Sequence, residues 1–102
     1  ASNFMVVEWD EAGQMFNTRF GKDEKDLIKK YPAEGTLSLK IIQQKKSLLL
    51  LKKDILKMIE KGEIIPKGAI PEMWMGVPLF NTDQLFGLMM IQHYRKPNQN
   101  SV

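Results

Sequence analysis

The sequence predicts an α+β domain in which helices pack on a central, mainly antiparallel sheet of about five strands. Two segments rich in β-forming residues, one near each end of the chain, each contain a polar turn and therefore predict a hairpin. Between the hairpins, two amphipathic helical patterns flank a short run of leucines. Hairpins at both ends favour antiparallel pairing, and the apolar sides of the helices need a sheet to cover.

Length and composition indicate one domain over residues 1–102, with 43% hydrophobic and 26% charged residues. The net charge is +3, but lysines alternate with acidic residues and arginine occurs only as Arg19 and Arg95, so we expect no nucleic-acid surface. The sequence has no apolar run long enough for a bilayer and no signal-peptide pattern. We therefore expect a cytoplasmic location without membrane contact.

The first hairpin is expected over Phe4–Phe20, with its turn at Asp10–Gly13. Its first strand, Phe4–Trp9, is nearly apolar on both pleat faces and therefore needs cover on both sides. Gly21–Pro32 is highly charged, and we interpret it as a connector with room for one short helix.

The middle of the chain predicts a helix, a strand and a second helix. Thr36–Lys46 has helical apolar spacing after a Gly-Thr start, and Leu48–Leu51 is interpreted as a buried strand. Asp54 is expected to cap a helix that runs to Lys61, with Gly62 at its left-handed end. Two prolines and a glycine in residues 66–71 then indicate irregular structure.

The second hairpin is expected from Met73–Phe80 and Leu85–Tyr94, joined by the turn Asn81–Gln84. Pro78 has no N–H group, which indicates an edge, a strand end or a bulge. Gly87 within a strand indicates a bulge or a close approach of two backbones.

The sequence offers no catalytic constellation. It has no cysteine, which excludes disulfides, thiolate metal sites and thiol nucleophiles, and a single histidine, His93, cannot form a zinc or iron site alone. The carboxylates of Asp10-Glu11 and of Asp23-Glu24 are adjacent in sequence and so point apart, unlike an acid/base pair. We expect no enzyme activity, no metal and no cofactor.

Trp74–Pro97, WMGVPLFNTDQLFGLMMIQHYRKP, resembles the terminal hairpin of GAF domains. Glu34–Glu63 resembles the family's helix, Leu-rich strand and following helix, and Phe4–Phe20 resembles its first hairpin. The resemblance implies a GAF/PAS-like (profilin-like) fold. It further implies a regulatory, small-molecule-sensing domain of a cytoplasmic signalling protein, such as a two-component sensor histidine kinase or a cyclic-dinucleotide enzyme.

Several functions of the family do not fit this sequence. The methionine sulfoxide reductases and the bilin-binding members of the family use cysteines, which the chain lacks. The Asn-Lys…Phe…Asp-Glu signature of cyclic-nucleotide-binding members is absent, and we do not expect His93 to act as the haem ligand found in some members.

The resemblance places a ligand cavity between the sheet and the segment Leu37–Gly76. Trp74 fits either the rim of such a pocket or the core. In a rival interpretation, methionine and leucine side chains fill the cavity, and the domain is a ligand-free dimerisation or spacer module. The candidate ligand-binding residues are Phe16, Arg19, Ile41, Ile55, Ile59 and Trp74.

GAF domains commonly carry a helix before the first strand and another after the last, and this sequence has neither flanking pattern. Phe4–Val7 and Leu88–Ile91 are apolar on both pleat faces, so two helices leave one sheet face short of cover. We therefore expect a homodimer formed through the sheet. The other expected partners are an unknown small-molecule ligand and the output domain of a longer protein.

Overall fold

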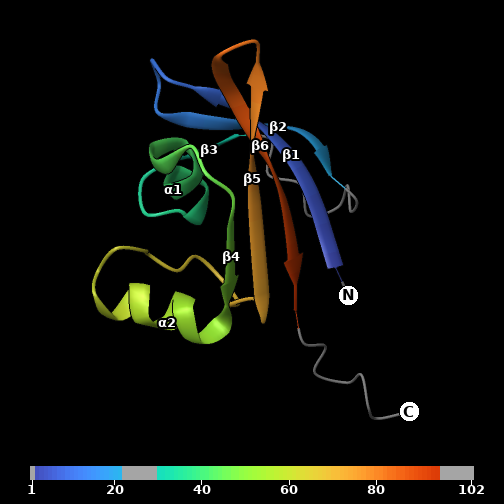
Figure 1. Ribbon diagram of the computed structural model, residues 1–102. Helices are drawn as coiled ribbons and strands as arrows, with labels where there is room; N and C mark the ends of the chain where they lie inside the picture. The colour runs from blue at the N-terminus through green and yellow to red at the C-terminus, as the bar shows by residue number, and fades with distance from the viewer. Residues whose placement is uncertain (1, 22–29, 95–102) are drawn as a thin grey trace.

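The computed structural model describes residues 2–21 and 30–94, which form a six-stranded sheet with two helices (Figure 1). Every strand pair is antiparallel, in the order β3-β2-β1-β6-β5-β4. The predicted α+β class is confirmed, with one strand more than the approximate count expected. The elements are β1 (Ser2–Asp10), β2 (Met15–Gly21), β3 (Lys30–Pro32), α1 (Leu37–Gln44), β4 (Leu48–Leu51), α2 (Lys52–Glu60), β5 (Met73–Asn81) and β6 (Gln84–His93).

Both predicted hairpins form, and they lie side by side because β1 pairs with β6. The β1–β2 turn is closed by the Gly13 N–H, which donates to the Asp10 carboxylate at 3.2 Å. The β5–β6 turn contains only Thr82 and Asp83 between the two strands. The β1–β6 pairing brings these two turns, far apart in sequence, to the same end of the sheet (Figure 1).

The additional strand, β3, lies at the end of the segment expected to be a connector. Tyr31 pairs with Phe16 of β2, and their ring centroids are 5.3 Å apart. Pro32 is tolerated because β3 is an edge strand with one neighbour. The sequence left room for one short helix in this connector, but residues 22–29 lie outside the described residues.

The expectation of a buried strand at β4 is wrong. β4 is the other edge of the sheet, and the side chains of Leu49 and Leu51 are 62% and 46% exposed. Leu48 and Leu50 are partly buried and pack against the core. Four identical leucines have no periodicity, so the sequence could not distinguish an edge strand from a central one.

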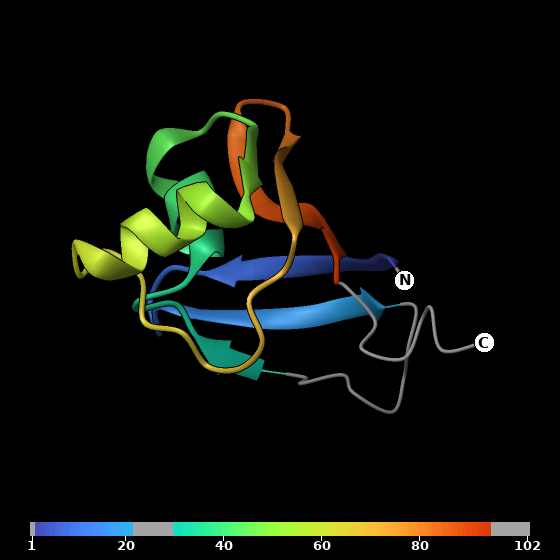
Figure 2. The same cartoon turned by 90° about the horizontal axis from the view of Figure 1, so that it is seen from below.

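Both helices lie on the same face of the sheet, as expected (Figures 1 and 2). The Thr36 hydroxyl caps α1 by accepting from the Leu39 N–H at 3.2 Å. The second helix begins at Lys52, two residues before the expected cap, and Asp54 instead accepts the Leu51 N–H at 2.9 Å. Gly62 has the predicted left-handed conformation, with φ of 79°.

The core fills the space between the helices and the sheet. Gly87 permits the expected close approach, because a Cβ there would overlap the Val7 carbonyl oxygen. Pro78 lies beyond the stretch of β5 that pairs with β4, so its missing N–H interrupts no ladder on that side. The buried core residues are Val7, Phe16, Ala33, Ile41, Ile55, Trp74, Leu88 and Met90.

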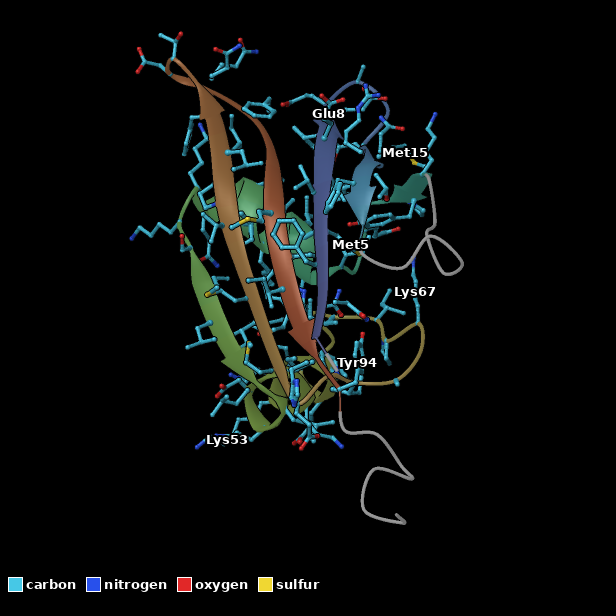
Figure 3. All side chains as sticks on the ribbon, turned by 90° about the vertical axis from the view of Figure 1, so that its right-hand side faces the viewer. Met5, Glu8, Met15, Lys53, Lys67 and Tyr94 are labelled. Atoms are coloured by element: carbon cyan, nitrogen blue, oxygen red, sulfur yellow. The ribbon has the colours of Figure 1, made fainter. Side chains whose placement is uncertain are left out.

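The opposite sheet face, here called the open face, carries neither α1 nor α2 (Figure 3). Cross-strand pairing forms continuous apolar rows on it, such as Leu49, Met75, Ile91 and Phe4 across four strands. The apolar residues of the open face include Phe4, Val6, Phe20, Leu49, Leu51, Met73, Met75, Val77, Leu79, Met89 and Ile91.

Candidate functional site

Five of the six candidate residues gather around the core beneath the helices. Phe16 and Ile41 are 0% exposed, Ile55 is 1% and Trp74 is 2%, while Ile59 is partly buried and packs against them. These side chains belong to one packed cluster between the helices and the sheet.

Trp74 illustrates how this space is filled. Its indole lies against Gly76, where an added Cβ would be 2.5 Å from the ring and 2.8 Å from an Ile41 side-chain carbon. Of the two roles that the sequence left open for Trp74, the structure gives it the core position.

Arg19 is not brought together with the other candidates. Side chains three apart on a regular strand point to opposite faces, and a bulge opposite Val6 and Val7 keeps Arg19 on the open-face side. Its guanidinium forms an exposed ion pair with Glu8. Phe16 and Arg19 therefore cannot line one pocket.

A cleft of about 870 Å³ lies elsewhere, where residues of the two hairpin turns approach α1 and its C-cap residue. Its volume is within the range of small-molecule sites. None of the six candidates lines it. The cleft is lined by Trp9, Glu11, Gln14, Leu39, Ile42, Gln43, Lys45, Asn81, Thr82, Asp83, Gln84 and Leu85.

The apolar part of the cleft is connected to the core. Trp9 packs on Phe16 with ring centroids 4.9 Å apart, and its indole N–H donates to the Glu11 carboxylate at 3.3 Å. Leu39 and Ile42 come from the side of α1 that packs against the core, and Leu85 comes from the start of β6. A ligand would therefore contact one aromatic and three aliphatic side chains that the fold holds in place.

The polar part of the cleft comes from the surrounding turns and the end of α1. Glu11 and Asp83 contribute carboxylates, and Lys45, which caps the C-terminus of α1, contributes an ammonium group. Thr82 and four residues with amide side chains, which can both donate and accept hydrogen bonds, complete the lining. The amide residues are Gln14, Gln43, Asn81 and Gln84.

Three backbone positions in the cleft are unusual. Among the described residues, the non-glycine residues with positive φ are Gln14 at 53°, Lys45 at 54° and Thr82 at 60°. Each belongs to a different cleft-forming segment: the β1–β2 turn, the end of α1 and the β5–β6 turn. Left-handed backbone is unfavourable for residues with a Cβ, above all for a β-branched residue such as threonine.

The groups with clearly shifted pKa values lie outside the cleft. Burial raises the pKa of Tyr31 above its usual 10.0, opposed by a hydrogen bond with Ser38, and burial also raises the pKa of Tyr94. A hydrogen bond from Lys40 and its charge lower the pKa of Glu63. Within residues 2–21 and 30–94, no cluster of three or more His, Cys, Asp or Glu side chains could hold a metal ion. No helix in these residues is long and apolar enough to cross a membrane.

No protein-family model and no curated protein matches the sequence. Among solved structures, the chain is similar to the GAF domain of a phosphoenolpyruvate-protein phosphotransferase from Acinetobacter, with 15% sequence identity and a TM-score of 0.68. The superposition covers 91% of this chain and 56% of that chain, so this chain spans little more than half of the solved structure's length. The expectation drawn from the terminal hairpin is confirmed at the level of architecture: this chain has a GAF-like fold.

Proposed function

We propose that the chain is a regulatory domain that senses a small molecule in the cleft between α1 and the two hairpin turns. The main support is that the three non-glycine residues with positive φ in the described part of the chain all line this cleft. Unfavourable backbone conformations often cluster at ligand sites, where the side chain has a role that glycine could not serve. Gln14, Lys45 and Thr82 each place a polar side chain at the cleft in this way.

The lining favours a polar ligand with an apolar or planar part. Trp9 and Ile42 offer contact surface, and Glu11, Asp83 and Lys45 offer charges of both signs. A ligand that bridges α1 and the turns would bind best to one arrangement of these segments and would thereby shift the population of states. We place such a domain in a cytoplasmic signalling protein, such as a sensor histidine kinase or a cyclic-dinucleotide enzyme, where it would act on an output domain.

A thermal-shift screen against nucleotides, amino acids and other small metabolites tests this proposal. Each compound that raises Tm is then titrated against the variants Thr82→Gly and Lys45→Gly. Both substitutions relieve left-handed strain of about 1 kcal/mol, so the unliganded variants should melt at or above the wild-type Tm. The ligand-induced rise in Tm should fall in both, because polar contacts in the cleft are lost.

Lys46→Gly is the matched control, since Lys46 is an exposed neighbour that does not line the cleft. Its ligand-induced shift should equal that of the wild type. The proposal is wrong if no compound in the screen raises Tm, or if both cleft variants retain the full shift.

A second candidate function is a ligand-free dimerisation or spacer module, favoured by the open face. Its apolar rows span roughly 20 Å in each direction, about 400 Å², which is comparable to the largest apolar patch of a typical monomer. A second copy packed on this face would remove the rows from water and form a closed twofold pair.

Sedimentation at micromolar concentration tests the second candidate. The wild-type chain should form a dimer that Met75→Glu on the open face converts to monomer. Leu56→Glu on α2 is the control, because Leu56 is also exposed, at 46%, but belongs to the helical layer. A wild-type chain that stays monomeric, or a dimer that Leu56→Glu disrupts equally, contradicts this candidate.

A further inference from the structure

β4 presents a free sheet edge with polar backbone groups. The strand pairs with β5 on one side only, and no described element covers its other side (Figure 3). An edge with unpaired N–H and C=O groups is a template for one more strand.

The register of β4 identifies the outward groups. Just beyond the strand, the Lys52 N–H donates to the Glu72 carbonyl at 3.1 Å, in line with the β4–β5 ladder. Ladder bonds involve alternate residues of an antiparallel strand. Leu48 and Leu50 therefore bond to β5, and the backbone groups of Leu49 and Leu51 point away from the sheet.

Both outward groups of Leu51 are already used. The Asp54 carboxylate accepts the Leu51 N–H at 2.9 Å, and the Leu51 carbonyl, at the N-cap of α2, accepts the first hydrogen bond of that helix. Both backbone groups of Leu49 remain for an added strand. The Leu49 and Leu51 side chains, 62% and 46% exposed, lie on the open face beside the place where that strand would run.

Positive charge lies at both ends of this edge. Lys46 precedes the strand and Lys53 follows it, and both are exposed without an ion pair in the described part of the chain. Figure 3 shows Lys53 at the lower end of β4 and Lys67 well away from β4, on the other side of β1 in this view. Lys52, unlike Lys46 and Lys53, has an ion-pair partner, because its ammonium lies 3.5 Å from the Glu72 carboxylate.

We propose that the β4 edge binds an extended peptide segment of a protein partner, with two apolar residues spaced two apart and acidic residues on both sides. The apolar pair would pack beside Leu49 and Leu51 and continue the apolar surface of the open face. The acidic residues would face Lys46 and Lys53. Backbone bonds supply the pairing, and the side-chain pattern supplies selectivity, as in other additions of a strand to a sheet edge.

Charge argues against a second copy of β4 as the occupant. Antiparallel pairing of two β4 edges would bring the lysines of both copies to one seam, and like charges on neighbouring strands are destabilising. Lysines at edges commonly oppose pairing between identical chains in this way. The same charges attract an acidic strand.

Fluorescence anisotropy with a labelled peptide of sequence Glu-Asp-Val-Thr-Val-Asp-Glu tests the proposal. The peptide should bind the full chain, and binding should weaken as salt increases. A peptide with lysines in place of the acidic residues should not bind. In the double variant Lys46→Glu/Lys53→Glu, affinity for the acidic peptide should fall about tenfold or more. The charge-matched control Lys67→Glu should leave it unchanged.

A backbone test separates strand addition from simple charge attraction. Leu49→Pro removes an outward N–H, which an edge strand tolerates, and should abolish binding. In the wild-type chain, the acidic peptide should slow hydrogen exchange of the Leu49 amide, a readout independent of how the proline variant folds. The proposal is overturned by equal binding of both peptides, by an unprotected Leu49 amide, or by a β4-mediated dimer that excludes the peptide.

Discussion

The two faces of the sheet are similarly apolar in sequence and very different in burial. On the helix-covered face, Val7, Phe16 and Leu88 are 0% exposed. On the open face, side chains range from partly buried, as at Met75, to 55% and 62% exposed at Phe20 and Leu49. The difference arises because both helices come from the middle of the chain and lie on one side (Figure 2). Composition makes both faces capable of burial, and topology decides which one is buried.

The two faces of the sheet differ in how much they contribute to stability. The covered face is packed by its own side chains, so substitutions there change the free energy of unfolding. The open face and the β4 edge are less buried, so substitutions there should change the free energy of unfolding less. The candidate ligand site lies at one end of the covered face, where the hairpin turns approach α1 and Trp9.

The largest expected difference between the faces is in the stability lost when each of two phenylalanines of β2 is replaced by alanine. Phe16→Ala should lower the free energy of unfolding by about 3–5 kcal/mol, since it leaves a cavity beside Trp9 and Tyr31. Phe20→Ala should lower it by about 1 kcal/mol, mainly through the lost edge contact with the Phe4 ring, 5.6 Å away. Urea unfolding of both variants under the same conditions measures the two losses. Equal losses would mean that the open face is covered in solution.

A smaller difference is expected when one methyl group is added to each face. Gly76→Ala places its Cβ against the Trp74 ring and Ile41, at 2.5 Å and 2.8 Å, and should cost about 1–3 kcal/mol. Val77→Ile adds a methyl group at the next residue, on the open face, and should change stability by less than about 0.5 kcal/mol. Thermal unfolding of the two variants measures the change in Tm at each position. If Gly76→Ala is as stable as the wild type, the covered face can accommodate an added methyl group at this position.

Much of this fold could be predicted from the sequence because its signals are local. Segments rich in β-formers around short polar turns predicted both hairpins, and Thr36 and Gly62 marked helix ends that the structure contains. The spacing of Ile41 and Ile55 correctly placed these residues on the covered side of their helices, although it indicated burial and not a pocket. An apolar residue that faces the core and one that faces a ligand give the same pattern.

The parts that could not be predicted depend on contacts between distant segments. β3 is only three residues long and lies in a charged segment, so no pattern distinguished it. The cleft exists because β1 pairs with β6 and brings Gln14 close to Thr82. Both turns were correctly located in the sequence, but nothing local indicated that they would meet at one site.

A modest effect is expected from loosening the helix that covers the core. The Thr36 hydroxyl accepts the Leu39 N–H at 3.2 Å, and Thr36→Ala leaves that donor without its cap. The free energy of unfolding should fall by about 1 kcal/mol. Ser47→Ala, an exposed residue between α1 and β4, is the control and should have little effect. If Thr36→Ala proves neutral in urea unfolding, packing on the sheet alone holds α1.

The smallest expected effect concerns an ion pair within the helical layer and depends on pH. Lys40 of α1 lies 2.9 Å from the carboxylate of Glu63, just after α2, and this contact lowers the pKa of Glu63 from its usual 4.5. A carboxyl whose pKa is lower in the folded state stabilises above its unfolded pKa, and this contribution disappears as pH falls through the folded pKa. Glu63→Gln should therefore lower Tm slightly at pH 7, and this loss should shrink as pH falls below 4.5, the usual pKa of the group. Glu60→Gln changes an exposed carboxyl without an ion pair in the described chain and should have no such pH-dependent effect. Because Glu63 is solvent-exposed, the difference at pH 7 should also shrink as salt increases, and a salt-independent difference would mean that the glutamate acts through packing.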